Sequence, residues 1–205
     1  MNINDALIQS GIERFSKMNK RATLPTFDEL PNIELYMDQV IALVNRYLAF
    51  FCENEDENVI THAMINNYVK QKIIPVPVKK RYSRVHLACL IMIGALKQTL
   101  SIPTIEFLLP NDCDEKQAEV IYNKFVDSWE NSFDMAIEML EEQLKMLAEQ
   151  KRYDDVYNLA TDMAVGSNVF KVFTDKMIYL HPDNAVKKAE KQEKKKSGEK
   201  EPKKK

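Results

Sequence analysis

The apolar run from Val85 to Leu96 constrains the fold of this chain more than any other stretch. Its apolar residues recur almost all the way round a helix, which is typical of a helix that is buried on every side. The run is interrupted by His86 and is too short to span a bilayer. It therefore predicts a central helix from about Arg84 to Thr99, capped by Ser83, with other helices packed around it.

The rest of the sequence predicts a mainly α-helical protein. The 205 residues include only four glycines, and valine, isoleucine and threonine show no regular alternation, so a large sheet is not expected. Helical spacing predicts further amphipathic helices, with Thr61 and Ser101 expected as the N-caps of two of them. They cover residues 4–18, 34–51, 61–72, 101–109, 114–130, 132–149, 152–164 and 168–179. The polar stretch with Pro25 and Pro31 is interpreted as a linker, with folding of the body beginning at Ile33.

Acidic residues are missing from one 48-residue segment of the chain. Asp and Glu make up 31 of 205 residues, yet none lies between Glu57 and Glu106, while seven Lys and Arg do. Outside this segment, and before the tail that begins at Lys187, the chain has 12 basic and 27 acidic residues. An acidic chain that clears carboxylates from one segment favours an anion-attracting surface there, and we expect the polyanion to be a nucleic acid.

The stretch IPVPVKKRYS, residues 74–83, is predicted to form a small hairpin. Pro75 and Pro77 prevent the preceding helix from continuing. The extended pieces on either side of Lys79 and Lys80 are then joined by a tight basic turn.

This order of elements resembles the DNA-binding domain of the MerR family of bacterial transcription regulators, a helix-turn-helix followed by a wing. THAMINNY (61–68) is similar to the family's recognition helix, and KQKIIP (70–75) to the turn that leads to its "GLLP". RYS (81–83) matches the point where the wing returns, and SIPTIEFLL (101–109) looks like the family's "SLEEIKELL" helix. The resemblance implies a winged helix-turn-helix with a small β-hairpin wing, followed by an α-helical C-terminal region.

Residues 30–130 are closer still to a bacterial family known only as a domain of unknown function, which itself carries a MerR-like fold. LPNIELYMDQV, MINNYVKQ and KKRYSRVHL carry this similarity. Four regions are expected: an N-terminal helix and linker (1–30), a MerR-like winged helix-turn-helix domain (31–112), an α-helical C-terminal region (113–182) and a disordered lysine-rich tail (183–205). No biochemical activity comes with this family, so function has to be argued from the site.

The MerR resemblance implies that the helix from Thr61 to Lys72 lies in the major groove of double-stranded DNA while the hairpin holds phosphates. Ordinary solvated surface is the alternative for these side chains, and a protein-interaction module that keeps the fold without binding DNA is the competing function. The candidate DNA-binding residues are His62, Asn66, Asn67, Lys70, Lys72, Lys79, Lys80, Arg81, Tyr82 and Arg84.

Two features depart from the MerR pattern. The recognition helix has Ala63, Asn66 and Asn67 where MerR regulators usually carry arginines and the first of two aromatics. Asparagine pairs with adenine edges, but the missing arginines weaken phosphate clamping. The turn, residues 76–80, is also several residues shorter than the family's wing.

MerR-like regulators are dimers, and the resemblance implies a homodimer joined by the helices 114–130 and 132–149. Trp129, Phe133, Met135 and Met139 lie on these helices. They are interpreted as a helix-helix core or dimer seam, with the pocket of an unidentified small-molecule effector as the alternative.

No recognisable catalytic or metal-binding motif is present in the sequence. It has no glycine-rich phosphate loop, nucleophile elbow or HExxH, and its three histidines are scattered. His86 and Cys89 lie one helical turn apart, but no third ligand is near them in the sequence, so they are interpreted as structural. Cys113 also lacks companion ligands. We therefore expect no enzyme activity, no cofactor and no metal.

The cysteines and the N-terminal sequence favour a cytoplasmic location. An odd cysteine count gives no disulfide framework. Asp5 and Glu13 stand where a signal peptide needs a basic region and then an unbroken apolar run. No association with a membrane is expected.

Overall fold

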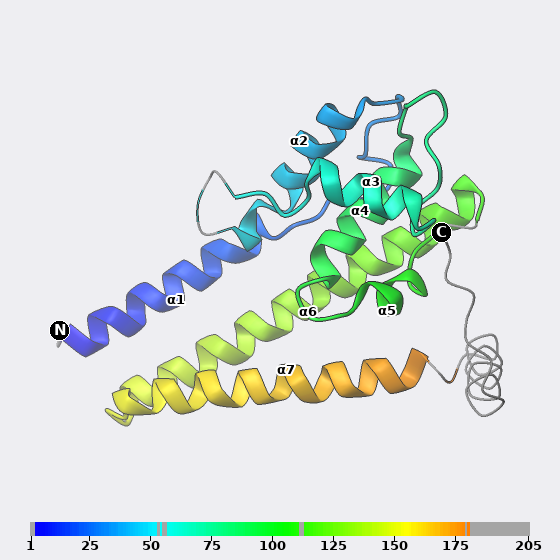
Figure 1. Ribbon diagram of the computed structural model, residues 1–205. Coiled ribbons are helices and arrows are strands. Elements are labelled where there is room, and N and C mark those ends of the chain that lie inside the picture. The colour runs from blue at the N-terminus through cyan, green and yellow to red at the C-terminus, as the bar shows by residue number, and fades with distance from the viewer. Residues whose placement is uncertain (1–2, 53, 55–56, 111–112, 179, 181–205) are drawn as a thin grey trace, which may run out of the picture. The chain divides into compact units, whose positions relative to one another are not determined.

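The computed structural model describes residues 3–52, 54, 57–110, 113–178 and 180, and these residues are mainly helical, as predicted (Figure 1). Their contacts divide the chain into two units, Met1–Asn158 and Leu159–Lys205. The lysine-rich tail predicted for residues 183–205 lies outside the described residues.

Helix α4 (Arg84–Leu96) is the centre of the first unit. Every residue from His86 to Ala95 is buried, which confirms the central helix that the apolar run predicts. Helix α2 (Met37–Tyr47), the short helix α5 (Ile102–Glu106) and the N-terminal part of helix α6 (Glu115–Glu149) contact it. Gly94 permits close packing with the segment after α2, because a Cβ atom added there would lie 2.2 Å from Cδ1 of Leu48.

Helix α2 is shorter than the predicted helix 34–51. It begins after Tyr36, whose backbone N–H donates to Oε1 of Gln39 at 2.9 Å. Its C-terminal part is replaced by the separate 3-10 turn η1 (Ala49–Phe51). Helix α3 (His62–Lys70) follows, and Oγ1 of Thr61 accepts a hydrogen bond from the backbone N–H of Met64, so the predicted N-cap is confirmed.

The stretch predicted as a linker belongs to the core. Its backbone is irregular, as two prolines require, but Leu24, Phe27 and Leu30 are each no more than 2% exposed. The backbone N–H of Phe27 donates to Oδ1 of Asn123 on α6 at 2.8 Å. The linker prediction is wrong, because these three side chains and that of Ala22 are buried although most of the residues around them are polar.

Helix α1 (Ile3–Arg21) confirms the predicted helix 4–18 and packs antiparallel to the second half of α6. Near its start, Asp5 accepts a hydrogen bond from the hydroxyl of Tyr153. Near its end, the hydroxyl of Ser16 donates to Glu141. Ile8 and Ile12 are buried along this contact.

Helix α6 is one continuous helix of 35 residues, so the prediction of separate helices 114–130 and 132–149 is wrong. The break expected at Asn131, between the two predicted helices, is absent. Nδ2 of Asn131 donates to the Asp127 carbonyl and Oγ of Ser132 to the Ser128 carbonyl, both at 2.7 Å. These bonds one turn back satisfy both polar side chains inside the helix, although they do not themselves stabilise it.

The segment after α3 forms a tight turn rather than a hairpin of strands. The backbone N–H of Arg81 donates to the carbonyl of Val78 at 2.9 Å, with Lys79 and Lys80 at φ 50° and 62°. Two isolated antiparallel bridges, Val78 with Arg81 and Leu35 with Tyr82, are the β-type pairings here. No strand is present within the described ranges, so the β-hairpin wing is not confirmed.

Helix α7 (Val156–Ile178) replaces the predicted pair 152–164 and 168–179, which is therefore wrong. Gly166 lies in the gap between the two predicted helices, and a glycine inside a helix costs only about 1 kcal/mol relative to alanine. Nδ2 of Asn168 also donates to the Ala164 carbonyl at 3.0 Å, one turn back. Among the described residues, no helix has the length and apolarity needed to cross a membrane.

Candidate nucleic-acid interface

Helix α3 presents a polar face and buries the opposite one. Ile65 and Tyr68 are buried, while His62, Asn66 and Asn67 are exposed. Oδ1 of Asn67 accepts a hydrogen bond from Nε2 of Gln71 at 2.9 Å. These polar side chains therefore share the outward face of the helix.

The end of α3 places two lysines at the surface. The N–H of Ile73 donates to the Tyr68 carbonyl and that of Lys72 to the Val69 carbonyl, which is the hydrogen-bond pattern of a Schellman motif. Lys72 is left-handed at φ 60°, and both Lys70 and Lys72 are exposed. The helix thus ends before Pro75, as predicted.

Lys79 and Lys80 occupy the two central positions of the next turn, and both are exposed. Positive φ at both positions is the geometry of the mirror-image turns that usually take asparagine and glycine. Val76 and Val78 beside them are each 66% exposed. The turn therefore exposes two ammonium groups, and the two exposed valine side chains lie beside them in the sequence.

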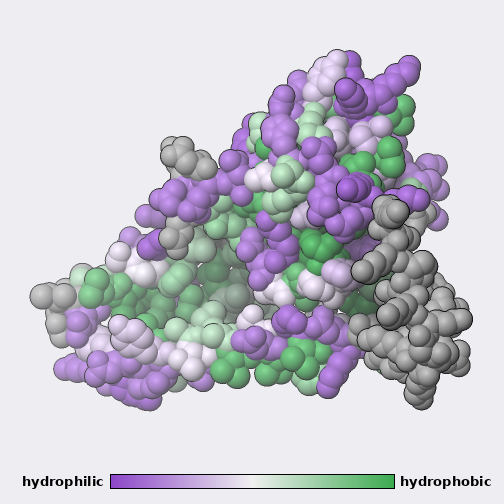
Figure 2. All heavy atoms as spheres, viewed as in Figure 1, coloured by the Kyte–Doolittle hydropathy of each residue, from purple (hydrophilic) through white to green (hydrophobic). Residues whose placement is uncertain are grey.

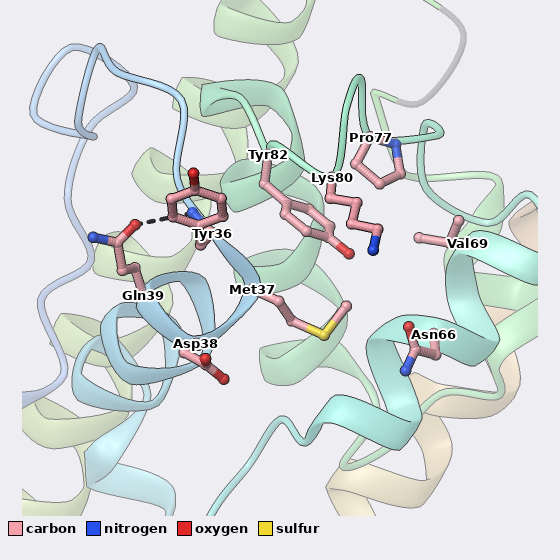
Figure 3. A pocket seen from close by; sticks show the side chains of 9 residues that line it. All are labelled: Tyr36, Met37, Asp38, Gln39, Asn66, Val69, Pro77, Lys80 and Tyr82. Atoms are coloured by element: carbon pink, nitrogen blue, oxygen red, sulfur yellow. Dashed lines mark hydrogen bonds between the residues drawn. The ribbon is translucent and has the colours of Figure 1, made fainter.

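A groove of about 700 Å³ separates α3 from this turn. Asn66 and Val69 line it from α3, and Pro77 and Lys80 from the turn segment. Figure 3 shows the Lys80 side chain and the Tyr82 ring directed into the same space, across from Asn66. The remaining lining residues come from the start of α2 and are Tyr36, Met37, Asp38 and Gln39.

One carboxylate borders this basic surface. Oδ1 of Asp38 lies 2.6 Å from Nε2 of His62, and both side chains are largely exposed. His62 is thus engaged by α2, on which Asp38 lies, outside the carboxylate-free segment.

Arg81 is held by an aromatic ring. Its guanidinium carbon lies 3.9 Å from the centroid of the Tyr36 ring, which is the distance of a cation–π contact. The contact follows from the Leu35–Tyr82 bridge, because the neighbouring residues Tyr36 and Arg81 are brought side by side. Arg81 is partly buried but keeps its charge at the edge of the groove.

Tyr82 and Arg84 are positioned differently from the other candidates. Tyr82 is 3% exposed, and burial raises the pKa of its hydroxyl. The Arg84 side chain is 13% exposed, with NH1 3.5 Å from Asp28 and its guanidinium 5.3 Å from the Phe27 ring centroid. Both residues connect the basic segment to the core, and neither offers an open contact to a large ligand.

Lys97, in the same carboxylate-free segment, is also bonded within the protein and is not available to an external ligand. Its ammonium donates to the Val59 carbonyl at 2.5 Å, and burial lowers its pKa. Five of the seven cationic side chains therefore remain for an external anion. They are Lys70, Lys72, Lys79, Lys80 and Arg81.

His86 fastens the turn segment to the start of α4. Its Nδ1 accepts a hydrogen bond from the backbone N–H of Ser83 at 3.0 Å, so Nε2 carries the proton and donates to the Pro75 carbonyl at 3.1 Å. Burial lowers the pKa of the ring. His86 is thus a neutral structural residue, and the described residues contain no group of three or more His, Cys, Asp or Glu side chains that could hold a metal ion.

The aromatic residues expected at a dimer seam lie in a cluster within the first unit. The Trp129 ring centroid lies 5.4 Å from that of Phe50 and 5.1 Å from that of Phe133. Nε1 of Trp129 also donates to the Ala22 carbonyl at 2.7 Å. The interpretation of Trp129 and Phe133 as a helix-helix core fits this packing, while Met135 and Met139 are exposed.

Some residues of the groove were not among the sequence candidates. Tyr36, Met37 and Asp38 lie near the start of α2, far in sequence from the turn that they face. The one signal that could have pointed to them is the stretch LPNIELYMDQV, which carries part of the family similarity.

The fold and site define a mainly helical protein whose basic helix and turn flank a groove. Residues 25–125, which hold α2 to α5, the turn and the groove, match a family described as Domain of unknown function (DUF1836). The match supports the domain-of-unknown-function family expected from the sequence. Comparisons with curated proteins and with solved structures gave no match.

Proposed function

We propose that this protein binds double-stranded DNA through α3 and the Lys79–Lys80 turn and acts as a bacterial transcription regulator with a MerR-like winged helix-turn-helix. The observation that carries the proposal is that five cationic side chains lie at the end of α3 and in the turn, the two elements on either side of the groove, within a segment that has no carboxylate of its own. Of the five, Lys80 lines the groove itself. Such a surface attracts the phosphate backbone.

In the proposed binding mode, α3 contacts the bases, and the lysines at its end and in the turn contact the phosphates. Asn66 on the exposed face of α3 reaches base edges, where asparagine pairs with adenine. Lys70, Lys72, Lys79 and Lys80 contact phosphates on either side. Arg81 adds a fixed charge, since its stacking on Tyr36 limits its motion.

The use of lysine in the turn supports a role for its charge. Left-handed backbone is unfavourable for a residue with a Cβ, whereas glycine and asparagine adopt it more easily. Lys79 and Lys80 therefore make the turn less stable than an Asn-Gly pair would. Their ammonium groups are exposed and form no part of the core. Contact with an external anion would account for lysine at these two positions.

Salt dependence of DNA binding tests the proposal. Duplexes selected from sheared genomic DNA would be titrated over about 50–200 mM salt, where each phosphate contact contributes a slope of about −0.9 in log affinity against log salt. The double variant Lys79→Ala/Lys80→Ala should make the slope shallower by about 2. The matched control is Lys116→Ala/Lys124→Ala, which removes the same charge from exposed positions on α6 and should leave the slope unchanged.

The competing function is a protein-interaction module, and the composition of the groove favours it. Most of the wall is apolar or aromatic, including Tyr36, Met37, Val69 and Pro77, and Asp38 would repel phosphate. A partner held by apolar contacts would show weak salt dependence. Equal slopes for the turn variant and its α6 control would exclude the turn from DNA binding and favour this alternative.

A further inference from the structure

Helix α7 carries a stripe of apolar residues at heptad spacing. Separations of four and three residues alternate along it, as in the seam of a coiled coil. The members, called here the α7 stripe, are Leu159, Met163, Phe170, Phe173, Met177 and Leu180, with Gly166 at the remaining position.

Most of the α7 stripe is exposed. Phe170 is 74%, Phe173 56% and Met177 66% exposed, and Leu180, just beyond the helix, is 77% exposed. Figure 2 shows hydrophobic side chains at the surface along α7. An apolar stripe of this length at a surface is typical of a site that another molecule covers.

We propose that the α7 stripe pairs with the same stripe of a second copy of this chain, in antiparallel orientation. This inference goes beyond the proposed DNA binding and does not depend on it. The heptad spacing selects a helix as the occupant, because knobs at these positions fit the holes of a facing helix.

The size of the α7 stripe fits a dimer. Aromatic side chains bury about 150–250 Å² each. With its two phenylalanines and its partly exposed Met and Leu side chains, the stripe offers roughly 600 Å² per chain. Two copies would bury roughly 1,200 Å², which lies at the lower edge of stable protein interfaces.

The shape of the stripe favours the antiparallel orientation. In the antiparallel register that pairs Leu159 with Met177 and Met163 with Phe173, Gly166 faces Phe170 of the second copy, and this happens twice by symmetry. No atom lies within 4 Å of a Cβ added at Gly166, so there is space above it. The largest exposed side chain of the stripe would thus lie over its smallest residue.

The charges beside the stripe favour the same orientation. Asp162 and Lys176 occupy equivalent flanking positions, each directly before a stripe residue, and both are exposed. In the antiparallel register each carboxylate meets the Lys176 ammonium of the second copy, which gives two opposite-charge pairs. A parallel register would place Asp162 beside Ser167 instead, with no opposite charge.

Sedimentation equilibrium of the full chain without DNA tests the dimer. Over about 1–100 µM, the wild-type protein should reach twice the mass of one chain. Phe170→Glu should weaken the dimer by at least about 30-fold, the effect expected for a central interface residue. Val172→Glu is the matched control, because Val172 is 49% exposed on the same helix but does not belong to the stripe. It should leave the dimer intact.

Several outcomes would overturn the dimer. A wild-type monomer at every concentration would mean that the stripe is covered by the rest of its own chain or by another surface. If Phe170→Glu and Val172→Glu weakened the dimer equally, association would not depend on the α7 stripe. Circular dichroism checks that both variants retain helix α7, so that a loss of association is not a loss of folding.

A charge exchange tests the orientation. Asp162→Lys and Lys176→Asp should each weaken the dimer, since each creates two like-charge pairs, and the double variant should restore it. A double variant no stronger than either single variant would overturn the antiparallel register. This readout needs no DNA, so its failure and a failure of DNA binding are separate results.

Discussion

Nε2 of His86 lies 3.1 Å from the carbonyl oxygen of Pro75 and joins the turn segment to helix α4. The ring is neutral, since its Nδ1 accepts the Ser83 N–H, and burial lowers its pKa. The unfolded chain, with a histidine pKa near its usual value of about 6.5, takes up a proton first as the pH falls. The contribution of His86 to stability is therefore complete above about pH 6.5 and is lost as the pH falls through the lower pKa of the folded state.

Urea unfolding at different pH values measures this effect. The wild-type free energy of unfolding should decrease on acidification with a His86 contribution of at most about 1.4 kcal/mol per pH unit. His86→Gln should lack that contribution, because glutamine can still accept the Ser83 N–H but does not titrate. Parallel profiles for His86→Gln and wild type would contradict the assignment.

Gly94 predicts a substitution that destabilises the core. Alanine in a helix normally gains about 1 kcal/mol over glycine. At Gly94 the added methyl group would lie 2.2 Å from Leu48 and 3.3 Å from Val59, both buried. Overpacking costs about 1–3 kcal/mol, so Gly94→Ala should lower the free energy of unfolding by about 1 kcal/mol net in urea titrations.

Gly11 provides the opposite case. A Cβ added there meets only Phe15, at 4.0 Å. Gly11→Ala should therefore stabilise the protein by up to about 1 kcal/mol. If Gly94→Ala and Gly11→Ala changed the free energy of unfolding in the same direction, close packing around Gly94 would not determine the effect of Gly94→Ala.

The sequence predicted features that depend on local chemistry. Thr61 and Ser101 accept hydrogen bonds from backbone N–H groups of the helices that they begin, as expected from residue type and position alone. The burial of α4 followed from its uniform apolarity. Proline and lysine placement predicted the turn at Lys79 and Lys80.

Features that depend on tertiary contacts were missed. Nothing local marks Phe27 as a core residue; it is buried because Asn123 and Tyr122 on α6 receive it. Arg84 resembles a surface cation in sequence, and only its contacts with Phe27 and Asp28 make it structural. Asn131 and Ser132, which are residue types that favour caps and turns, lie inside α6 with their side chains bonded to carbonyls one turn back.

Arg84 should affect stability more than DNA binding. Its stem and guanidinium pack on Phe27 and reach Asp28, so Arg84→Ala should lower the free energy of unfolding by about 1–2 kcal/mol. Lys70→Ala, at an exposed position, should change it by no more than about 0.5 kcal/mol. Chemical denaturation compares the two. If Arg84→Ala instead left stability intact and reduced the salt slope of DNA binding, Arg84 would be a phosphate contact.

The Lys79–Lys80 turn predicts that one variant changes stability and DNA affinity in opposite directions. Lys79→Asn/Lys80→Gly places the residues preferred at positive φ in both central positions of the turn. Relief of left-handed strain should raise the free energy of unfolding by about 1 kcal/mol. The loss of two ammonium groups should make the salt slope of DNA binding shallower by about 2.

Thermal unfolding and DNA titration of this variant, beside Lys79→Ala/Lys80→Ala, separate the two effects. The alanine variant loses the same charges but keeps a Cβ at both left-handed positions, so it should bind DNA as weakly without gaining the stability. Stabilisation with unchanged DNA affinity would mean that the turn lysines serve solubility alone. Weaker binding in both variants, with stabilisation in only one, would show that the chain gives up turn stability for two cations at the edge of the groove.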